Sequence, residues 1–238
     1  MLQFKNFSFG YKYPLINKTI NVDIPPSSLT VLFGNNGSGK TCLIKTLARL
    51  NKPLSGAIFY NQRPIQELDA SYFSRHFAFL MTTRPFLMNH TIMDIIALGR
   101  IPYLRWDAQL NEEDIKVIEY YAHYFNLKDI LNKPANEVSD GQLQKALIVR
   151  TLVQQTNVVI LDEPLSFLDY GTKKLVIKKL KQIAREENKI VILSAHDIHL
   201  CLKYVDTVFL IHQKDWAYND KDKITSSDVF ENFLNTEE

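Results

Sequence analysis

Residues 34–41, which read Gly-Asn-Asn-Gly-Ser-Gly-Lys-Thr, constrain the fold more than any other part of this sequence. The chain has only eight glycines, yet three of them fall within this short segment. The apolar run Leu29–Phe33 comes directly before it, and residues 42–50 follow with apolar side chains at helical spacing. This order of strand, glycine-rich loop and helix is typical of a loop that binds phosphate. The segment therefore predicts an α/β fold in which the loop joins a buried strand to a helix.

The residue types in this loop fit the binding of a nucleoside triphosphate. Glycines let successive backbone N–H groups turn around phosphate oxygens, and the positive end of the helix that follows adds to the attraction. Lys40 would neutralise the β and γ phosphates, and the Thr41 hydroxyl would bind Mg²⁺. We call residues 34–41 the phosphate loop.

A pair of acidic residues follows a second buried strand. Val158–Leu161 is a run of four apolar residues, and Asp162 and Glu163 come directly after it. Ligands of open parallel sheets bind at the carboxyl ends of the strands, where these two carboxylates would lie. Asp162 would then hold the Mg²⁺, and Glu163 would polarise an attacking water. The alternative is that the two acidic residues only open a surface loop.

Residues 139–142, Ser-Asp-Gly-Gln, allow two interpretations. Ser-x-x-Gln before an apolar run is a capping box, which begins a helix. A capped helix start also presents backbone N–H groups that attract an anion such as phosphate. Both interpretations can hold together, and we call these residues the signature segment.

Apolar periodicity indicates strands at both ends of the chain and helices in its middle. Alternating apolar residues within 1–60 predict strands with turns, and from residue 85 the spacing becomes helical. Strands that alternate with helices after residue 156 predict a parallel sheet covered on both faces. The helices expected are 91–98, 111–125, 139–153, 175–184 and 198–204, and the later strands are 158–161, 190–193 and 208–211.

We expect one domain with three parts. The boundaries follow the change from strand-like to helical spacing and the concentration of acidic residues at the end of the chain. The parts are a nucleotide-binding core of residues 1–84 and 156–214, a helical insert of residues 85–155, and an acidic C-terminal tail of residues 215–238.

Composition excludes several classes of protein. No apolar run approaches the ~18 residues that a membrane-spanning helix requires. The first residues lack the basic and apolar stretches of a signal peptide, so we expect a cytoplasmic protein. The two cysteines, Cys42 and Cys201, cannot form a disulfide framework and lack the spacing of a zinc site.

The formal net charge of +2 is too small to indicate a nucleic-acid partner, and we expect none. Seven acidic residues against two lysines give residues 215–238 a net charge of −5, which leaves +7 for the rest. Five lysines between residues 173 and 181 alternate with apolar side chains, which favours the solvated face of a helix.

Taken together and in order, these motifs resemble the nucleotide-binding subunit of an ATP-binding cassette (ABC) transporter over residues 4–230. The phosphate loop matches the first phosphate motif of the family, the signature segment its signature motif, and residues 158–163 its second, acidic motif. The resemblance implies the α/β P-loop NTPase fold of these cassettes. That fold has an N-terminal antiparallel β subdomain, a mainly parallel core sheet and a helical insert subdomain.

Three further positions resemble family motifs, and each also has a simpler interpretation. Asp169, in Ser166-Phe-Leu-Asp169, matches the loop at the dimer seam but could simply cap the next helix. His196 matches the switch histidine, yet it could be a buried structural histidine or form a metal pair with His199. Tyr11, 23 residues before Gly34, matches the aromatic that stacks on adenine, although Tyr13 lies on the same predicted strand face.

The resemblance implies ATP and Mg²⁺ as cofactors and assigns residues to three roles. The catalytic residues are Glu163, His196 and Lys40. The ATP-binding residues are Tyr11, Gly34, Asn35, Asn36, Gly37, Ser38, Gly39, Lys40, Thr41, Cys42, Ser139, Gly141, Gln142 and Asp169. The Mg²⁺ ligands are Thr41, Thr82 and Asp162.

Two positions depart from the family pattern. Thr82 stands where a glutamine is usual; threonine keeps an oxygen for Mg²⁺ but is shorter, so we expect communication with the membrane subunit to be affected. Asp140 replaces a glycine of the signature segment, where its carboxylate would favour its own helix start by ~0.3–1 kcal/mol but repel a phosphate. We expect the Asp140 side chain to point away from the nucleotide.

A narrower resemblance concerns the transported compound. Residues 97–104, Ala-Leu-Gly-Arg-Ile-Pro-Tyr-Leu, and residues 152–156 are similar to the cassette subunits of importers for iron-siderophore, haem or cobalamin. The alternative for the first segment is a helix that Gly99 and a proline turn bring to an end.

The family resemblance also implies partners. These are a second copy of the chain, so that two cassettes enclose ATP, integral membrane permease subunits, and indirectly a substrate-binding protein. The chain would then lie on the inner face of the cell membrane. The helical insert, which has the apolar stretch Pro85–Met88 near its start, would be the dock for a permease loop. The alternatives are a soluble ABC ATPase outside transport, such as one in cluster assembly, and a weakly hydrolysing regulatory subunit.

Overall fold

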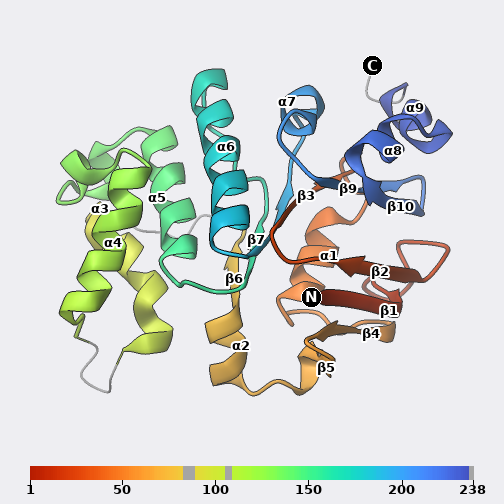
Figure 1. The fold of residues 1–238 in the computed structure, drawn as a ribbon, viewed down its shortest axis with the longest axis horizontal. Coiled ribbons are helices and arrows are strands. Elements are labelled where there is room, and N and C mark those ends of the chain that lie inside the picture. Colours follow the sequence, from red (N-terminus) through yellow and green to blue (C-terminus); the bar gives the residue numbers. More distant parts are fainter. Residues whose placement is uncertain (83–88, 105–108, 236–238) are drawn as a thin grey trace. The chain divides into compact units, whose positions relative to one another are not determined.

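The computed structural model describes residues 1–82, 89–104 and 109–235 (Figure 1). The chain forms two compact units, one of Met1–Asp69 with Ile177–Glu238 and the other of Ala70–Val176. These units are defined by compactness, so the functional division expected at residues 85 and 155 stays a prediction. No helix in the described residues is both long and apolar enough to cross a membrane.

The first unit contains the antiparallel sheet expected near the N-terminus. Strand β1 pairs with β2 on one side and with β4 on the other, in the order β2-β1-β4-β5. Leu2 and Phe4 point into the core, and a bulge at Asn6 (φ 47°) changes the register so that Phe7 and Phe9 are buried too. The strands are β1 (Leu2–Ser8), β2 (Ile20–Ile24), β4 (Ser55–Tyr60) and β5 (Arg63–Pro64).

The same unit contains a mainly parallel group of strands that positions the phosphate loop. Strand β3 (Ser28–Phe33) is buried along its whole length and pairs in parallel with β8 (Ile190–Ser194) and β9 (Thr207–His212). Strand β10 (Asp215–Asp220) runs antiparallel to β9 at the edge. Every residue of β3, β8 and β9 is buried, which fits this arrangement because parallel strands are covered on both faces. The helices of this unit are α1 (Lys40–Leu47), η1 (Ile65–Glu67), α7 (Ile198–Leu202), α8 (Lys221–Thr225) and α9 (Asp228–Leu234).

The C-terminal segment is more than an acidic tail. Residues 215–235 form β10, α8 and α9, which bury Ile224, Phe230 and Phe233. Few apolar residues at irregular spacing among many acidic ones gave no periodic signal for these elements. The segment therefore contributes to the core of the first unit.

The second unit combines two parallel strands with most of the helices. Strand β6 (Phe77–Leu80) pairs with β7 (Val158–Leu161), and Asp162 N–H extends the ladder to Leu80 at 2.8 Å. The helices expected at 91–98, 111–125 and 139–153 are confirmed, and each begins with a complete capping box at Thr91, Asn111 or Ser139. The helices are α2 (Ala70–His76), α3 (Ile92–Ala97), η2 (Leu98–Tyr103), α4 (Glu112–Tyr124), η3 (Lys128–Ile130), η4 (Ala135–Glu137) and α5 (Asp140–Leu152), and α6 (Tyr170–Glu186) leads on to the first unit.

A buried arginine organises the segment that resembles metal-chelate importers. Helix α3 ends at Ala97 and the 3-10 helix η2 follows it, so the end of the helix predicted at residue 98 is confirmed to within one residue. Arg100 is 5% exposed, and its Nε donates to Asp114 Oδ1 at 2.7 Å. Its Nη1 donates to Val153 O at 2.7 Å and Gln155 Oε1 at 2.8 Å. This one side chain therefore joins η2 to the start of α4 and to the end of α5.

Candidate nucleotide-binding site

The phosphate loop has the backbone expected of it. Gly37 (φ 80°) and Gly39 (φ 107°) adopt left-handed conformations that residues with a side chain rarely occupy. Gly39 is the N-cap of α1, and in the described structure no side chain caps this helix, whereas Ser139 caps α5 and Asn111 caps α4. The loop thus leads directly into a helix start that favours an anion.

Lys40 is held inside the loop that it is expected to serve. Its side chain is 6% exposed, and its Nζ donates to the carbonyl oxygens of Gly34 and of Asn35, the latter at 3.2 Å. Thr41, next in the chain, is half-buried at the first turn of α1. The ammonium group is therefore placed where phosphate oxygens could replace its carbonyl partners.

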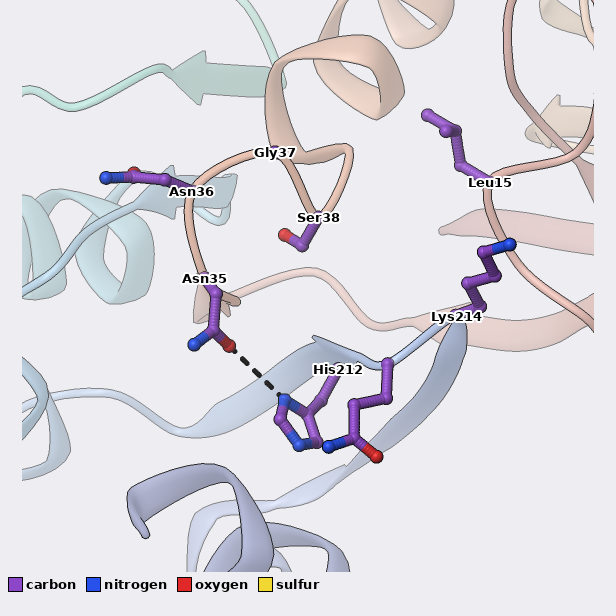
Figure 2. Close-up of a pocket in the computed structure, with 8 residues that line it drawn as sticks. Leu15, Asn35, Asn36, Gly37, Ser38, His212 and Lys214 are labelled. Atoms are coloured by element: carbon purple, nitrogen blue, oxygen red, sulfur yellow. Dashed lines mark hydrogen bonds between the residues drawn. The ribbon is translucent and has the colours of Figure 1, made fainter. Parts of the chain in front are cut away.

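A cavity of about 400 Å³ lies against the phosphate loop within the first unit (Figure 2). Figure 2 shows Ser38 pointing into the space between the loop and His212, whereas Asn36 points away from Leu15 and Lys214. The lining residues come from the loop, from the segment after β1, and from the end of β9 with the turn that follows it. They are Leu15, Asn35, Asn36, Gly37, Ser38, His212, Gln213 and Lys214.

Tyr11 lies in a turn, and the expectation of a strand at Tyr11 and Tyr13 is wrong. Strand β1 ends at Ser8, and a bridge between Gly10 and Pro14 closes a turn in which both tyrosines are about 70% exposed. A methyl group on Gly39 would lie 3.0 Å from Leu15 Cδ1, so the segment that carries Tyr11 packs beside the phosphate loop. A tyrosine ring on this turn is free to stack on a base.

Cys42 faces the core of the first unit. It is 3% exposed in α1, and burial raises the pKa of its thiol. Asn51 Nδ2 lies 3.8 Å from its Sγ. Any contact of Cys42 with a nucleotide would therefore be made by its backbone.

His196 is exposed directly after β8, so the interpretation of a buried structural histidine is wrong. The next residue, Asp197, caps α7 by accepting from Leu200 N–H at 3.2 Å. The short helix therefore fixes the turn on which the exposed His196 stands.

The expected metal ligands Asp162 and Thr82 and the expected catalytic Glu163 come together in the second unit. Asp162, Glu163 and Thr82 line one cavity of about 160 Å³, and Thr82 Oγ1 donates to Asp162 Oδ2 at 3.3 Å. Glu163 has a positive φ of 51°, which is uncommon for a residue with a side chain and concentrates at functional sites. Ser166 Oγ donates to Glu163 Oε2 at 3.3 Å. These carboxylates thus belong to one formed site.

Gln144 is a residue of this cavity that the sequence motifs did not indicate. Its side chain is buried, and its Nε2 donates to Pro164 O at 3.2 Å, which ties α5 to the segment that carries Glu163. The sequence signal that could have identified Gln144 was a glutamine on the predicted buried face of an apolar helix.

The signature segment is a capped helix start, as one of the two interpretations required. Ser139 Oγ accepts from Gln142 N–H at 3.2 Å, and Gln142 Oε1 accepts from Ser139 N–H at 2.9 Å. A methyl group on Gly141 would lie 3.3 Å from Phe167 O, so this helix start packs against the loop of residues 166–169. Asp140 is exposed at the first position of α5.

Asp169 caps α6, which confirms its simpler interpretation and leaves its role at a dimer seam a prediction. Its Oδ1 accepts from Thr172 N–H at 2.9 Å and its Oδ2 from Thr172 Oγ1 at 2.6 Å. These hydrogen bonds from Thr172 lower the pKa of the Asp169 carboxyl below its ordinary value.

Comparison with known proteins agrees with this site. The family described as ABC transporter matches residues 17–166, more than half of the chain. An ABC transporter ATP-binding protein of Methanocaldococcus jannaschii is 35% identical over 96% of this chain and 79% of that protein. An iron(3+)-hydroxamate import ATP-binding protein of Bacillus subtilis is 26% identical over 85% of this chain and 76% of that protein.

Solved structures of ABC transporter cassettes have a similar fold. The dimeric structure of a bacterial ABC transporter cassette superimposes with a TM-score of 0.80 at 21% identity, and the match covers 93% of this chain and 99% of that chain. The α/β P-loop NTPase fold expected from the motifs is therefore confirmed. With the phosphate loop and the acidic strand end both inside the matched region, the chain belongs to the ABC transporter family, as an ATP-binding subunit that hydrolyses ATP.

Proposed function

We propose that this chain binds and hydrolyses ATP to energise a membrane importer for iron-siderophore, haem or cobalamin. The observation that carries the proposal is a phosphate loop with a buried Lys40 and a formed cavity around Glu163, in a chain similar to an iron(3+)-hydroxamate import protein.

In this proposal Lys40 and Mg²⁺ offset the charge of the phosphates, and Tyr11 stacks on the adenine. Oxygen ligands suit Mg²⁺, and Thr41, Asp162 and Thr82 each offer one. Bound Mg²⁺ would neutralise charge that develops on the γ-phosphate. Glu163 orients the attacking water, and the exposed His196 contacts the γ-phosphate.

Two chains would enclose two ATP molecules. The capped start of α5 in one chain, with Ser139, Gly141 and Gln142, would face the ATP held on the phosphate loop of the other. A helix N-terminus supplied in this way would stabilise charge on the phosphoryl group during transfer. Asp169 would lie near the seam, and the solved dimeric cassette provides a precedent in a related fold.

The membrane partner would be a permease, approached from the inner face of the cell membrane, and a substrate-binding protein would act through it. The helical insert would be the dock, and its apolar stretch Pro85–Met88 lies outside the described residues. The exposed Leu98 and Ile101 of η2 offer apolar side chains in the same unit.

Affinity purification of the tagged chain from its native cell in mild detergent, with mass spectrometry of what co-purifies, tests this proposal. Recovery of a polytopic membrane protein supports it, with an untagged strain as the control. Recovery of soluble proteins alone would contradict transport and favour a soluble ABC ATPase. A weakly hydrolysing regulatory subunit would instead retain the permease but show little ATP turnover.

A further inference from the structure

His212 lies beside the phosphate loop because of the strand pairing in the first unit. Strands β3 and β9 run in parallel with Phe33 opposite Leu210, so the residues two positions further along, Asn35 after β3 and His212 at the end of β9, remain neighbours. His212 Nδ1 lies 3.2 Å from Asn35 Oδ1, within the range of a hydrogen bond in which the ring N–H donates (Figure 2). The second residue of the phosphate loop is thus held by a side chain 177 positions away.

The ring of His212 is itself held by the C-terminal helix. Phe233 of α9 meets it edge to face, with ring centroids 5.7 Å apart, and His212 is only 8% exposed. The same Phe233 stacks on Phe33, with centroids 6.4 Å apart, and Phe33 is the last residue before the loop. Helix α9 therefore contacts both the strand that ends at the loop and the histidine that holds it.

The burial of His212 suggests a specific use of its imidazole. Among the described residues, its Nε2 is buried without a hydrogen-bond partner, which carries a cost that an apolar side chain would avoid. The hydrogen bond between its Nδ1 and Asn35 Oδ1 gives a reason for an imidazole, and not an apolar side chain, at this position. The backbone carbonyl oxygen of Asn35 accepts a hydrogen bond from Lys40 Nζ at 3.2 Å. A side chain that holds Asn35 in place therefore also holds one hydrogen-bond partner of Lys40.

We propose that His212 is a positioning residue of the nucleotide site, and that α9 acts on ATP binding through it. The inference rests on the phosphate loop binding ATP. A loop with two left-handed glycines loses conformational freedom when it closes on phosphate, and a loop ordered beforehand loses less. His212 supplies this order by holding Asn35, and Phe233 supplies it by packing on His212 and on Phe33.

Substitutions of His212 test whether Nδ1 or Nε2 of its ring supports ATP binding. In His212→Asn the side-chain amide nitrogen replaces Nδ1, whereas in His212→Gln it replaces Nε2, and His212→Leu removes both. We expect His212→Leu and His212→Gln to raise the Kd for the non-hydrolysable analogue AMP-PNP about threefold to tenfold, the effect of one lost hydrogen bond. His212→Asn should stay within about twofold of the parent, and kcat at saturating ATP should change little in all three.

A double-mutant cycle shows whether Asn35 is the partner. Asn35→Ala should weaken binding of AMP-PNP, and adding His212→Leu to it should weaken binding no further. The exposed His123 of α4 provides the matched control, and His123→Leu should leave the Kd unchanged. Thermal unfolding of each variant verifies that it is folded.

Three results would overturn the inference. They are equal affinity in all His212 variants, a His212→Asn variant as weak as His212→Leu, and additive losses in the cycle. A parent chain that bound no nucleotide would overturn the proposed function as well, and this control is measured separately. Phe233→Leu, which keeps α9 apolar, should weaken binding in the same direction as His212→Leu, and unchanged binding would contradict the role of the helix.

Discussion

At the residue scale, Arg100 and Asp114 form a buried ion pair in which loss of either partner should be costly. Their side chains are 7% and 2% exposed, and Asp114 Oδ2 also accepts from Asn111 N–H in the capping box of α4. A buried pair adds little net stability compared with apolar residues, but removing one partner leaves an uncompensated charge. The pair is therefore expected to affect the free energy of unfolding mainly when one partner is removed.

Arg100→Met is accordingly expected to destabilise the protein by about 3–5 kcal/mol. Chemical denaturation monitored by circular dichroism measures this, and the double variant Arg100→Met with Asp114→Asn, which removes the charge but keeps an oxygen for Asn111 N–H, should recover part of the loss. A double variant less stable than Arg100→Met alone would contradict the assignment of the cost to the unpaired carboxylate.

Asp206 makes the stability of the first unit depend on pH. Burial alone would raise the pKa of this carboxyl, but hydrogen bonds from Leu29 N–H and from Lys181, with a further one from Arg185, outweigh it and hold the pKa below its ordinary value. A lowered pKa in the folded state contributes stability above the unfolded value of about 3.9, and this is lost as the pH falls through the folded pKa. Asp206→Asn should thus be less stable than the parent at pH 7, by roughly 1 kcal/mol.

The difference in unfolding free energy between parent and Asp206→Asn should shrink as the pH is lowered below about 4. Denaturation curves at a series of pH values measure it. A difference that stays constant down to pH 2 would exclude the carboxylate charge as the cause.

At the element scale, the helix starts are the features that the sequence predicts best. Ser139, Asn111 and Thr91 each precede a helix, and each caps its own backbone within three residues. Such signals are local, so periodicity and capping residues suffice to find them. Strand β10 and helices α8 and α9 were not predicted, because their few buried residues, such as Phe230 and Phe233, are separated by exposed acidic ones.

The cap of α5 separates a structural role of Ser139 from a role toward ATP. Ser139→Ala loses the bond to Gln142 N–H and should lower stability by about 1 kcal/mol, whereas Ser139→Asn keeps a good cap and should not. If Ser139 faces the ATP of a partner chain, both variants should lower kcat for ATP by about tenfold or more. Parent-like hydrolysis by Ser139→Asn would limit Ser139 to the cap.

At the scale of the whole molecule, the residues proposed to act on ATP come from both compact units. Lys40, Thr41 and His196 belong to the first, and Asp162, Glu163 and the signature segment belong to the second. The motifs located nearly all of them, since each follows a buried strand or begins a helix. His212 and Gln144 were not located, because their contacts with Asn35 and Pro164 depend on pairing between segments far apart in the chain.

The mass of the Glu163→Gln variant in the presence of Mg²⁺ and ATP, measured by size-exclusion chromatography with light scattering, tests the central claim most directly. Phosphate release is recorded on the same sample, with Lys40→Ala as the variant that should fail to bind ATP. The account predicts that Glu163→Gln binds ATP, doubles its mass to that of a dimer and releases little phosphate. A variant that stays monomeric at saturating ATP, or that releases phosphate as fast as the parent, would contradict it.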